Sequence, residues 1–350
     1  MEKEKVIVGM SGGVDSTVAA YLLKEQGYEV IGVTMYLWAG KEAEIAIADA
    51  KRVADQLGIE HIVLDFRDSF RKEVVDDFIG RYAEGLTPNP CVMCNRMIKG
   101  EALLQKAHEL GAKYMATGHY ARVEKHPVTG RYSIRNSSTA EKDQTYALYR
   151  LTQEQLQAML LPIGEYTKAE VRQFAEKVDG FIAKKGDSQD ICFIPDGDYA
   201  KFILEQGGDV GTAGSFVNMS GDVLGQHKGL IHYTVGQRKG LGIAFGKPMY
   251  VHSLDTKNNR VLLCENEELF RTTMYVGQVA HMSVAEFTDG MRLQGKIRYA
   301  HKAAWCTVRM VGEDKLECVF DEPQRAMTPG QSLVLYDGDF VAGGGIALAE

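Results

Sequence analysis

The chain has 350 residues, of which 45% are hydrophobic and 25% are charged, so it can bury a substantial core and is expected to form two or three domains. Its formal net charge of -7 excludes a generally basic surface for nucleic acid, although a locally basic face can exist within an acidic protein. Apolar stretches fall short of the roughly 20 residues of a membrane span, and the first residues lack the apolar region of a signal peptide. We therefore expect a cytoplasmic protein without a membrane partner.

Up to about residue 180, short β-rich runs alternate with longer helical runs. The first five runs are KVIVGM, STVAAYLLKEQG, EVIGVTMYL, EAEIAIADAKRVADQLG and EHIVLDF. This alternation predicts an α/β fold with a parallel sheet and flanking helices for residues 1–204. Further helices are expected within residues 69–85 and 95–111, and the TKAE stretch at 167–170 predicts a helix that begins with a capping box.

The second half of the chain is rich in short strands. Residues 205–273 are punctuated by glycine and show little helical periodicity, which predicts a small, mostly β central domain. Residues 274–350 alternate apolar and polar side chains in KIRYAHKAAWCTVRMV, KLECVFDE and QSLVLYDGDFVAGGGIAL. That pattern is typical of a compact barrel, so we expect a C-terminal β-barrel.

The stretch GMSGGVDS, Gly9–Ser16, lies between the first predicted strand and the first predicted helix. Its two adjacent glycines let backbone N–H groups turn toward an anion, its serine hydroxyls add donors, and the helix points its positive end at the same place. The stretch lacks the ending of a Walker A loop and the spacing of a Rossmann fingerprint. A plain strand-to-helix turn capped by Asp15 or Ser16 is the structural alternative.

The whole stretch resembles the SGGxDS pyrophosphate-binding loop of the ATP pyrophosphatase family, whose members cleave ATP to AMP and pyrophosphate. The resemblance implies a PP-loop domain of the adenine nucleotide alpha hydrolase-like kind that uses ATP with Mg²⁺ and adenylates an oxygen of its substrate. Asp15 would help to hold the Mg²⁺ ion. The implied ATP-binding residues are Gly9, Met10, Ser11, Gly12, Gly13, Val14, Asp15, Ser16, Met35 and Gly118. Without the resemblance, core packing explains Met35 and a turn explains Gly118.

Six cysteines are too few for a disulfide scaffold in a chain of this length, so each is expected to be a thiol. Cys91 and Cys94 form a Cys-x-x-Cys pair, which supplies only two of the four ligands of a structural zinc ion, so no metal site is expected there. Cys192 follows Lys184 and Lys185, whose charges would favour a thiolate. A packed core cysteine is the alternative for Cys192.

Seven motifs, taken together and in chain order, resemble the tRNA-specific 2-thiouridylase family. They are SGGVDS, NPCVMCN, ATGHYARV, KDQTYALYRL, KKGDSQDICFIPDGDY, YTVGQRKGLGI and FDEPQRAMTPGQSLVLYDGD, and they span nearly the whole chain. The resemblance implies that ATP adenylates the 2-carbonyl oxygen of the wobble uridine of tRNA and that sulfur then replaces this oxygen. Cys192 would carry the sulfur as a persulfide, and Cys94 would be the nucleophile. A cysteine desulfurase or a sulfur-relay protein would be the donor, and either hydrosulfide or the persulfide itself would attack.

The resemblance also implies a set of residues that contact the tRNA. They are Asn89, Pro90, Cys91 and His119 near the target base, and Lys142, Asp143, Gln144, Arg298, Tyr299 and Gln331 elsewhere. Independently of the resemblance, residues 291–309 hold five basic side chains and no acidic one, with two aromatic residues among them, which favours a phosphate-facing strip. A solvated basic strand face is the alternative for that strip, and a polar turn is the alternative for residues 142–144.

Cys91 departs from the family pattern, because some relatives have an acidic residue at this position. A general acid or base role therefore cannot be transferred to it, and its thiol could replace Cys94 or form an off-pathway disulfide. The Cys-Asn-Arg context favours Cys94 as the nucleophile.

Two rival functions use fewer of these motifs. An AMP-forming ligase or an amidotransferase synthetase that acts on a small carboxylate or a purine explains the phosphate loop but leaves the cysteine motifs and the basic strip unused. A non-catalytic RNA-binding protein would require a broken residue in the loop, and SGGVDS matches the SGGxDS pattern throughout.

Overall fold

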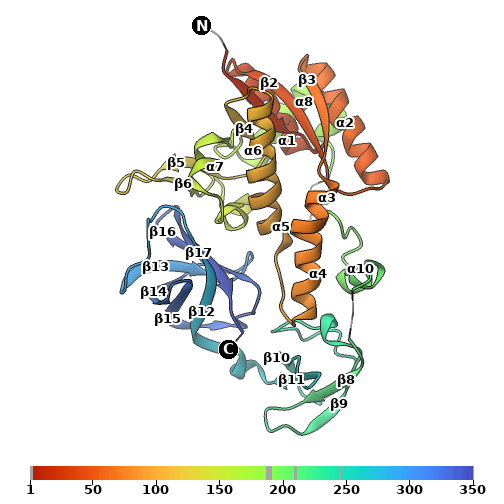
Figure 1. Cartoon of the computed structure of the whole chain (residues 1–350), viewed down its shortest axis with the longest axis vertical. Coiled ribbons are helices and arrows are strands. Elements are labelled where there is room, and N and C mark those ends of the chain that lie inside the picture. The colour runs from red at the N-terminus through yellow and green to blue at the C-terminus, as the bar shows by residue number, and fades with distance from the viewer. Residues whose placement is uncertain (1–2, 187–190, 209–210, 244–245, 350) are drawn as a thin grey trace.

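The computed structural model describes residues 3–186, 191–208, 211–243 and 246–349. It comprises an N-terminal α/β domain, a small central β region and a C-terminal barrel, which lie at the top, bottom and lower left of Figure 1. The fold class predicted from the sequence is therefore confirmed. Residues 187–190 belong to the KKGDSQDICF motif and lie outside the described residues.

Five parallel strands form the sheet of the N-terminal domain, in the order β3-β2-β1-β4-β7. They are β1 (Lys5–Gly9), β2 (Glu29–Tyr36), β3 (Glu60–Asp65), β4 (Tyr114–Ala116) and β7 (Met159–Leu160). Val6, Ile7 and Val8 of the central strand are completely buried, because helices cover both faces of the sheet. The strand order reverses between β1 and β4, and open α/β sheets bind ligands beyond the carboxyl ends of the strands at such a point.

Helices pack on both faces of this sheet. On one face, α1 (Val14–Glu25), α2 (Lys41–Leu57) and α8 (Lys168–Val178) contribute to the same core as Val6 and Val8. On the other face, α6 (Leu103–Glu109) and α7 (Gln153–Ala158) contribute to a second core with Ile7. The two faces alternate along β1 because successive strand residues point in opposite directions. The predicted capping box is confirmed, since Thr167 and Glu170 each accept a backbone hydrogen bond from the other at the start of α8.

Two helical segments connect β3 to β4, and the second carries the Cys-x-x-Cys pair. The first runs through α3 (Arg67–Phe70), the π-helix η1 (Arg71–Val75) and α4 (Asp76–Ala83), and the second through α5 (Pro90–Met93), the π-helix η2 (Cys94–Ala102) and α6. Both predicted helices are present, but the second begins before residue 95. Asn89 caps it by accepting the Cys91 N–H at 3.1 Å, and a proline suits the first helical position.

Short helices complete the helical part of the described residues. They are α9 (Gly180–Ala183), α10 (Tyr199–Glu205) and the 3-10 turns η3 (Ala140–Lys142), η4 (Thr145–Leu148), η5 (Leu230–His232) and η6 (Asn266–Leu269). Among the described residues, no helix combines the length and the apolar character that a membrane crossing requires.

The central β region is a four-stranded sheet with its own core. Its strands are β8 (Gly214–Val217), β9 (Val223–His227), β10 (Tyr250–Asp255) and β11 (Arg260–Cys264), in the order β10-β11-β8-β9. Phe216, Tyr233 and Val251 are among the side chains that this sheet buries. The small mostly β domain predicted from the glycine-punctuated sequence is present.

Six antiparallel strands form the C-terminal barrel. They are β12 (Phe270–His281), β13 (Met291–Lys296), β14 (Ala304–Gly312), β15 (Lys315–Arg325), β16 (Ser332–Asp337) and β17 (Phe340–Ala347). Their order is β12-β15-β14-β13-β16-β17, and pairing between β12 and β17 closes the barrel, as predicted. Cys306, Cys318 and Phe320 lie in its interior, so these two thiols are core residues of the barrel.

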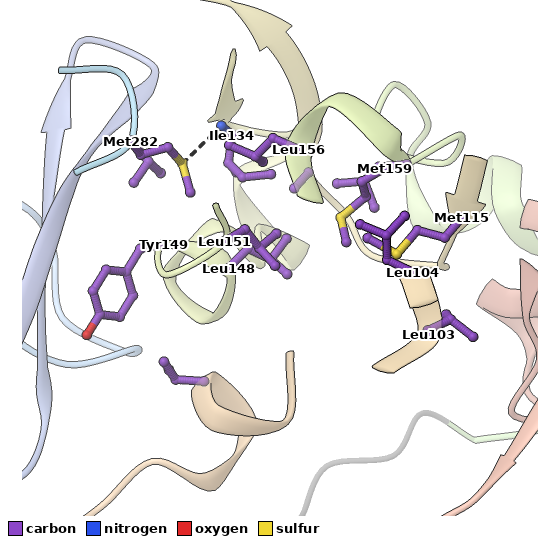
Figure 2. Packing of buried hydrophobic residues seen from close by; sticks show 14 of the residues in the cluster. Leu103, Leu104, Met115, Ile134, Leu148, Tyr149, Leu151, Leu156, Met159 and Met282 are labelled. Atoms are coloured by element: carbon purple, nitrogen blue, oxygen red, sulfur yellow. Dashed lines mark hydrogen bonds between the residues drawn. The ribbon is translucent and has the colours of Figure 1, made fainter. Parts of the chain in front are cut away.

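A hairpin from the first domain extends the sheet of the barrel, which the sequence did not predict. Its strands are β5 (Arg122–Lys125) and β6 (Tyr132–Arg135), and Arg135 pairs with Phe340 of β17. Side chains from both domains share one core, shown in Figure 2, where the Ile134 N–H donates to the sulfur of Met282 at 3.3 Å. The barrel is therefore packed firmly against the domain that carries the phosphate loop.

Candidate active site

The loop between β1 and α1 has the geometry of an anion-binding turn. Gly12 has a φ of +67°, and a Cβ at this position would lie 2.5 Å from the carbonyl oxygen of Ala46, so only glycine fits. The Ser11 N–H donates to the Ser16 hydroxyl at 3.1 Å, which closes the turn. Helix α1 begins after Gly13, and among the described residues no side chain caps its first turn. The alternative interpretation, a turn capped by the side chain of Asp15 or Ser16, is therefore wrong. The N–H groups at the helix N-terminus are available to bind an anion.

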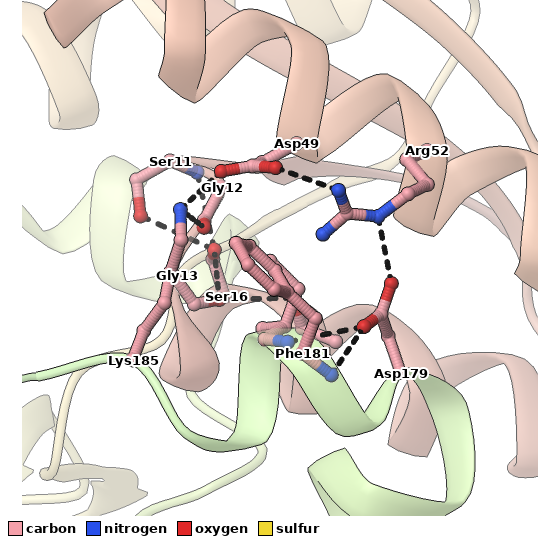
Figure 3. Close-up of polar contacts among 11 residues, drawn as sticks. Ser11, Gly12, Gly13, Ser16, Asp49, Arg52, Asp179, Phe181 and Lys185 are labelled. Carbon is pink, nitrogen blue, oxygen red and sulfur yellow. Dashed lines mark hydrogen bonds and ion pairs between the residues drawn. The ribbon is translucent and has the colours of Figure 1, made fainter.

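Two lysines from distant parts of the chain lie against this loop. Lys185 donates to the carbonyl oxygen of Gly12 at 2.9 Å and forms an ion pair with Asp49 of α2, as Figure 3 shows. Lys168, in the first turn of α8, lies 2.7 Å from the Asp15 carboxylate. The expectation that Lys185 would act on Cys192 is wrong, because its ammonium group lies at the phosphate loop.

The remaining residues of the predicted ATP site gather around the loop at the carboxyl edge of the sheet. A Cβ on Gly118 would lie 2.6 Å from the backbone carbon of Asp15, so the loop after β4 packs directly against the phosphate loop. The methyl carbon of Met35 lies 3.2 Å from the position that a Cβ on Gly9 would take. Met10 and Val14 are buried, so their side chains position the loop from within the core.

A second group of residues brings three thiols together beside the phosphate loop. Cys91 and Cys94 lie one helical turn apart, and Cys94 is only 8% exposed. Ile191 and Phe193, on either side of Cys192, pack in the same apolar cluster as Cys94. Two cysteine motifs that are far apart in the sequence thus meet at one site.

Burial and one cation set the electrostatics of these thiols. Burial raises the pKa of Cys94 to about 12. Cys91 and Cys192 are exposed to solvent, yet the protein around their sulfurs also raises the pKa of each thiol above its ordinary value. Lys99 acts in the opposite direction and lowers the pKa of all three thiols. The positive charge expected from the sequence near Cys192 is therefore supplied by Lys99.

Lys99 was not predicted from the sequence as a residue of the site, because its position depends on the π-helix η2. In an α-helix, a residue five positions after Cys94 would lie about 140° around the axis and face away from it. In a π-helix the i→i+5 hydrogen bond closes one turn, so Lys99 comes round to the side of Cys94. Sequence periodicity predicts ordinary α-helix here and carries no sign of the wider turn.

His119 joins the thiol site to the phosphate loop. Its Nε2 lies 3.5 Å from the Lys99 ammonium nitrogen, its Nδ1 lies 2.7 Å from the Thr117 hydroxyl, and its neighbour Gly118 contacts the loop. Burial, and then the charge of Lys99, hold the pKa of His119 well below its usual value. The imidazole is therefore neutral at pH 7 and can offer a hydrogen bond without adding a charge.

The predicted tRNA residues 142–144 form a turn beside this site. The Asp143 carboxylate accepts the N–H groups of Ser137 and Thr145 at 3.0 and 3.1 Å, and Gln144 accepts the N–H of Tyr120 at 2.9 Å. The Asp143 and Gln144 side chains are used within the protein, which fits the polar-turn alternative. Gln144 holds the backbone of Tyr120, whose hydroxyl donates to Asp15 at 2.9 Å.

Tyr299 of the barrel reaches over the rim of the thiol site. Its hydroxyl donates to the carbonyl oxygen of Asp143 at 3.2 Å, and the residue remains 49% exposed. It lies close enough to Cys91 and Lys142 for their charges to affect its pKa, which burial raises. An exposed aromatic ring therefore lies near Cys91.

Arg298 and Gln331, also predicted to contact tRNA, make contacts between domains. Arg298 donates to the carbonyl oxygens of Val235 and Ala326, each at 2.9 Å, and so joins the central region to the barrel. Gln331 donates to the carbonyl oxygen of Thr87 at 2.8 Å, just before the Cys-x-x-Cys pair. Both side chains thus orient the barrel relative to the site.

Two of the five basic side chains in residues 291–309 form ion pairs within the barrel. Arg292 pairs with Asp321 at 2.6 Å, and Arg309 pairs with Glu317 at 2.7 Å, both across to β15. The phosphate-facing strip therefore stays a prediction, and two of its five basic side chains already have acidic partners within the protein. These acidic partners could not be predicted from residues 291–309 alone, because they lie on a different strand, β15.

A phosphate loop at the carboxyl edge of a parallel sheet, with two β domains behind it, defines a nucleotide-binding protein of the HUP class. A family model described as the tRNA methyl transferase HUP domain matches residues 4–196. Models described as the tRNA methyl transferase PRC-barrel domain and the aminomethyltransferase beta-barrel domain match residues 200–265 and 271–347.

Curated relatives extend over nearly the whole chain. The tRNA-specific 2-thiouridylase MnmA of Lachnoclostridium phytofermentans is 50% identical over 353 residues, covering 98% of this chain and 99% of that protein. The corresponding proteins of Clostridioides difficile and Acetivibrio thermocellus are 51% and 49% identical, covering 98% and 99% of this chain and 98% and 99% of their own lengths. The chain belongs to the tRNA-specific 2-thiouridylase family, and the resemblance drawn from the seven motifs is confirmed.

Proposed function

We propose that this protein is an ATP-dependent tRNA sulfurtransferase that converts the wobble uridine of tRNA to 2-thiouridine, with AMP and pyrophosphate as the other products. The observation that carries the proposal is the meeting of a phosphate loop with Cys94 and Cys192 in a chain that is half identical to 2-thiouridylases. The descriptions of the matching family models name a methyl transferase, but methyl transfer would leave the thiols beside the phosphate loop without a role.

The first step is adenylation of the 2-carbonyl oxygen, which becomes part of a good leaving group as pyrophosphate departs. The loop N–H groups and the helix N-terminus bind phosphate oxygens, and Lys168 and Lys185 offset the negative charge of the pyrophosphate. Asp15 fits a Mg²⁺ ion, because Mg²⁺ takes one or two carboxylates together with phosphate oxygens. When bound, Mg²⁺ would neutralise part of the phosphate charge.

The second step is sulfur transfer, in which AMP leaves as a carbon–sulfur bond forms. Cys192 carries the incoming sulfur as a persulfide, and Cys94 attacks the inner sulfur of Cys192. In one route, this attack releases the outer sulfur as hydrosulfide, which then attacks the uridine. In the other route, the persulfide has already joined its outer sulfur to the uridine, and the attack of Cys94 frees that sulfur from Cys192. Both routes end with a disulfide between Cys94 and Cys192, which a reductant must open before the next cycle.

The exposed side of the site faces the partners. Solvent reaches Cys192, so a cysteine desulfurase or a sulfur-relay protein can deliver sulfur there. Tyr299 and Asn89 lie at the rim where an extruded base enters, and extrusion costs a few kcal/mol.

We divide the chain into three domains. The chemistry takes place in residues 1–204, residues 205–273 form the central region, and residues 274–350 form the barrel that contacts the tRNA. Since ATP and tRNA are both reactants of the cytoplasm, we propose that the protein acts there.

The test combines purified protein with ATP, Mg²⁺, tRNA and a persulfide source, followed by mass spectrometry of the digested nucleosides. Cys94→Ser and Cys192→Ser should each abolish 2-thiouridine but keep tRNA-dependent release of pyrophosphate. Cys264→Ser, which removes a thiol buried in the central region, is the control and should retain both activities. Full product with Cys192→Ala would overturn the proposal, and pyrophosphate exchange driven by a small carboxylate without tRNA would favour the ligase.

A further inference from the structure

The proposed function leaves one thiol of the site without a role. Cys91 lies three residues before Cys94, and residues at this spacing share one side of a helix. Its exposure differs from that of its neighbour, because solvent reaches Cys91 and Cys192 but Cys94 is buried. The three sulfurs are close enough that Cys94 interacts electrostatically with both of the others, and Cys192 interacts with Cys91.

Direct reduction of a disulfide between Cys94 and Cys192 is hindered at this site. An external dithiol cannot reach the buried Cys94 sulfur, so it must attack Cys192 and expel Cys94 as the leaving group. Burial makes Cys94 a poor leaving thiolate, and exchange slows as the pKa of the leaving thiol rises. Cys91 would expel the same leaving group, but its attack is intramolecular and therefore has a high effective concentration that an external dithiol lacks.

We propose that Cys91 is the resolving thiol of the catalytic cycle and moves the disulfide from the buried Cys94 to the solvent-exposed pair of Cys91 and Cys192. The Cys91 sulfur attacks the Cys192 sulfur, one S–S bond breaks as another forms, and the proton lost by Cys91 is taken up by Cys94. This exchange involves no net oxidation. A dithiol reductant of the thioredoxin class then supplies two electrons and two protons and regenerates Cys91 and Cys192. This inference rests on the proposed function.

Two features of the site favour this direction of exchange. The proton ends on Cys94, the thiol that burial most favours in its protonated form. The new disulfide joins two solvent-exposed cysteines, and the charge of Lys99, which lowers the pKa of each thiol, stabilises either of them as a leaving thiolate when the reductant attacks. Sulfur transfer can thus take place in a buried site while reduction takes place at its surface.

The first test maps the disulfide after one turnover. Protein loaded with one equivalent of persulfide is mixed with ATP, Mg²⁺ and tRNA without reductant, quenched in acid, alkylated and digested for mass spectrometry. We expect a Cys91–Cys192 disulfide and an alkylated Cys94 in the wild type, and a Cys94–Cys192 disulfide in Cys91→Ser. A wild-type protein that accumulates the Cys94–Cys192 disulfide would overturn the inference.

The second test compares rates. With a thioredoxin-type dithiol as the only reductant, the ratio of steady-state rate to first-turnover rate should fall about tenfold in Cys91→Ser, since the intramolecular step is lost. The ratio should be unchanged in Cys264→Ser, and an unchanged ratio in Cys91→Ser would contradict the resolving role. A first turnover without 2-thiouridine would instead contradict the proposed function. In that case the disulfide map of wild-type protein equilibrated in a glutathione redox buffer decides whether Cys91 and Cys192 pair.

Discussion

Lys168 places its ammonium nitrogen 2.7 Å from the Asp15 carboxylate, although 153 residues separate the two in the chain. Tyr120 donates its hydroxyl to the same oxygen at 2.9 Å, so one atom of the phosphate loop is held from two distant segments. The contact sets the first turn of α8 against the first turn of α1. A positive charge therefore lies at the start of α1, beside the phosphate loop.

Replacing Lys168 with methionine should raise the apparent KM for ATP by about tenfold or more, because a charge-assisted hydrogen bond contributes roughly 1.5–3 kcal/mol. The measurement is tRNA-dependent exchange between ATP and labelled pyrophosphate. Lys177→Met is the control, since Lys177 lies in the last turn of the same helix and packs on Phe174. An unchanged KM in Lys168→Met would show that the lysine serves only to hold Asp15.

Gly12→Ala should weaken ATP binding and lower the thermal stability. The new Cβ would lie 2.5 Å from a backbone oxygen of Ala46, in addition to the cost of a positive φ. Gly27→Ala is a matched control, because Gly27 also has a positive φ of +92° but the described residues leave open space around it. The melting temperature of Gly12→Ala should be roughly 2 °C or more below that of Gly27→Ala. Equal melting temperatures would contradict the tight packing of the loop against α2.

Lys99→Met should slow the alkylation of Cys192 by iodoacetamide at pH 8. Lys99 lowers the pKa of this thiol, so its removal raises the pKa further and reduces the fraction of reactive thiolate. Residue-resolved mass spectrometry of the alkylated protein measures the rate. Lys106→Met removes a lysine that pairs with Glu109 on α6 and should leave the rate unchanged. A Cys192 rate that is the same in both variants would exclude Lys99 as the activating charge.

The buried Cys94 should respond to pH differently from an ordinary thiol. Its pKa is raised to about 12 by burial, so the thiolate fraction and the alkylation rate should keep rising up to that pH. Folding favours the protonated thiol, so this group leaves stability unchanged below its unfolded pKa of about 8.5 and reduces it progressively as pH rises from there toward 12. The loss of stability at high pH should therefore be smaller in Cys94→Ala. An alkylation rate that levels off near pH 9 would contradict the burial of this sulfur.

Arg298→Lys should lower the melting temperature of the protein in the absence of tRNA. The guanidinium bonds carbonyl oxygens of Val235 and Ala326 at once, and a lysine ammonium cannot keep this fork geometry. Lys302→Ala, in the neighbouring loop, is the control and should leave the melting temperature unchanged. If Arg298→Lys weakens tRNA binding at an unchanged melting temperature, its role is direct RNA contact instead of domain positioning.

Structural features that depend on only a few adjacent residues were predictable from the sequence. SGGVDS specifies a tight turn because glycine adopts conformations that other residues avoid, and the capping box at Thr167 and Glu170 involves groups only three residues apart. The alternation of strand and helix patterns predicted the sheet and the barrel, because each element must bury its own apolar side. Such features require no knowledge of what lies across the core.

The partners of the charged side chains depended on the tertiary structure. Lys185 was expected near Cys192 and lies at Gly12, while Arg292 of the basic segment pairs with an acidic residue of a neighbouring strand. Lys99 reaches the thiols only because the helix widens into a π-helix at Cys94. Charges and thiols interact over a few ångströms in space, and packing between segments remote in the sequence determines which of them come that close.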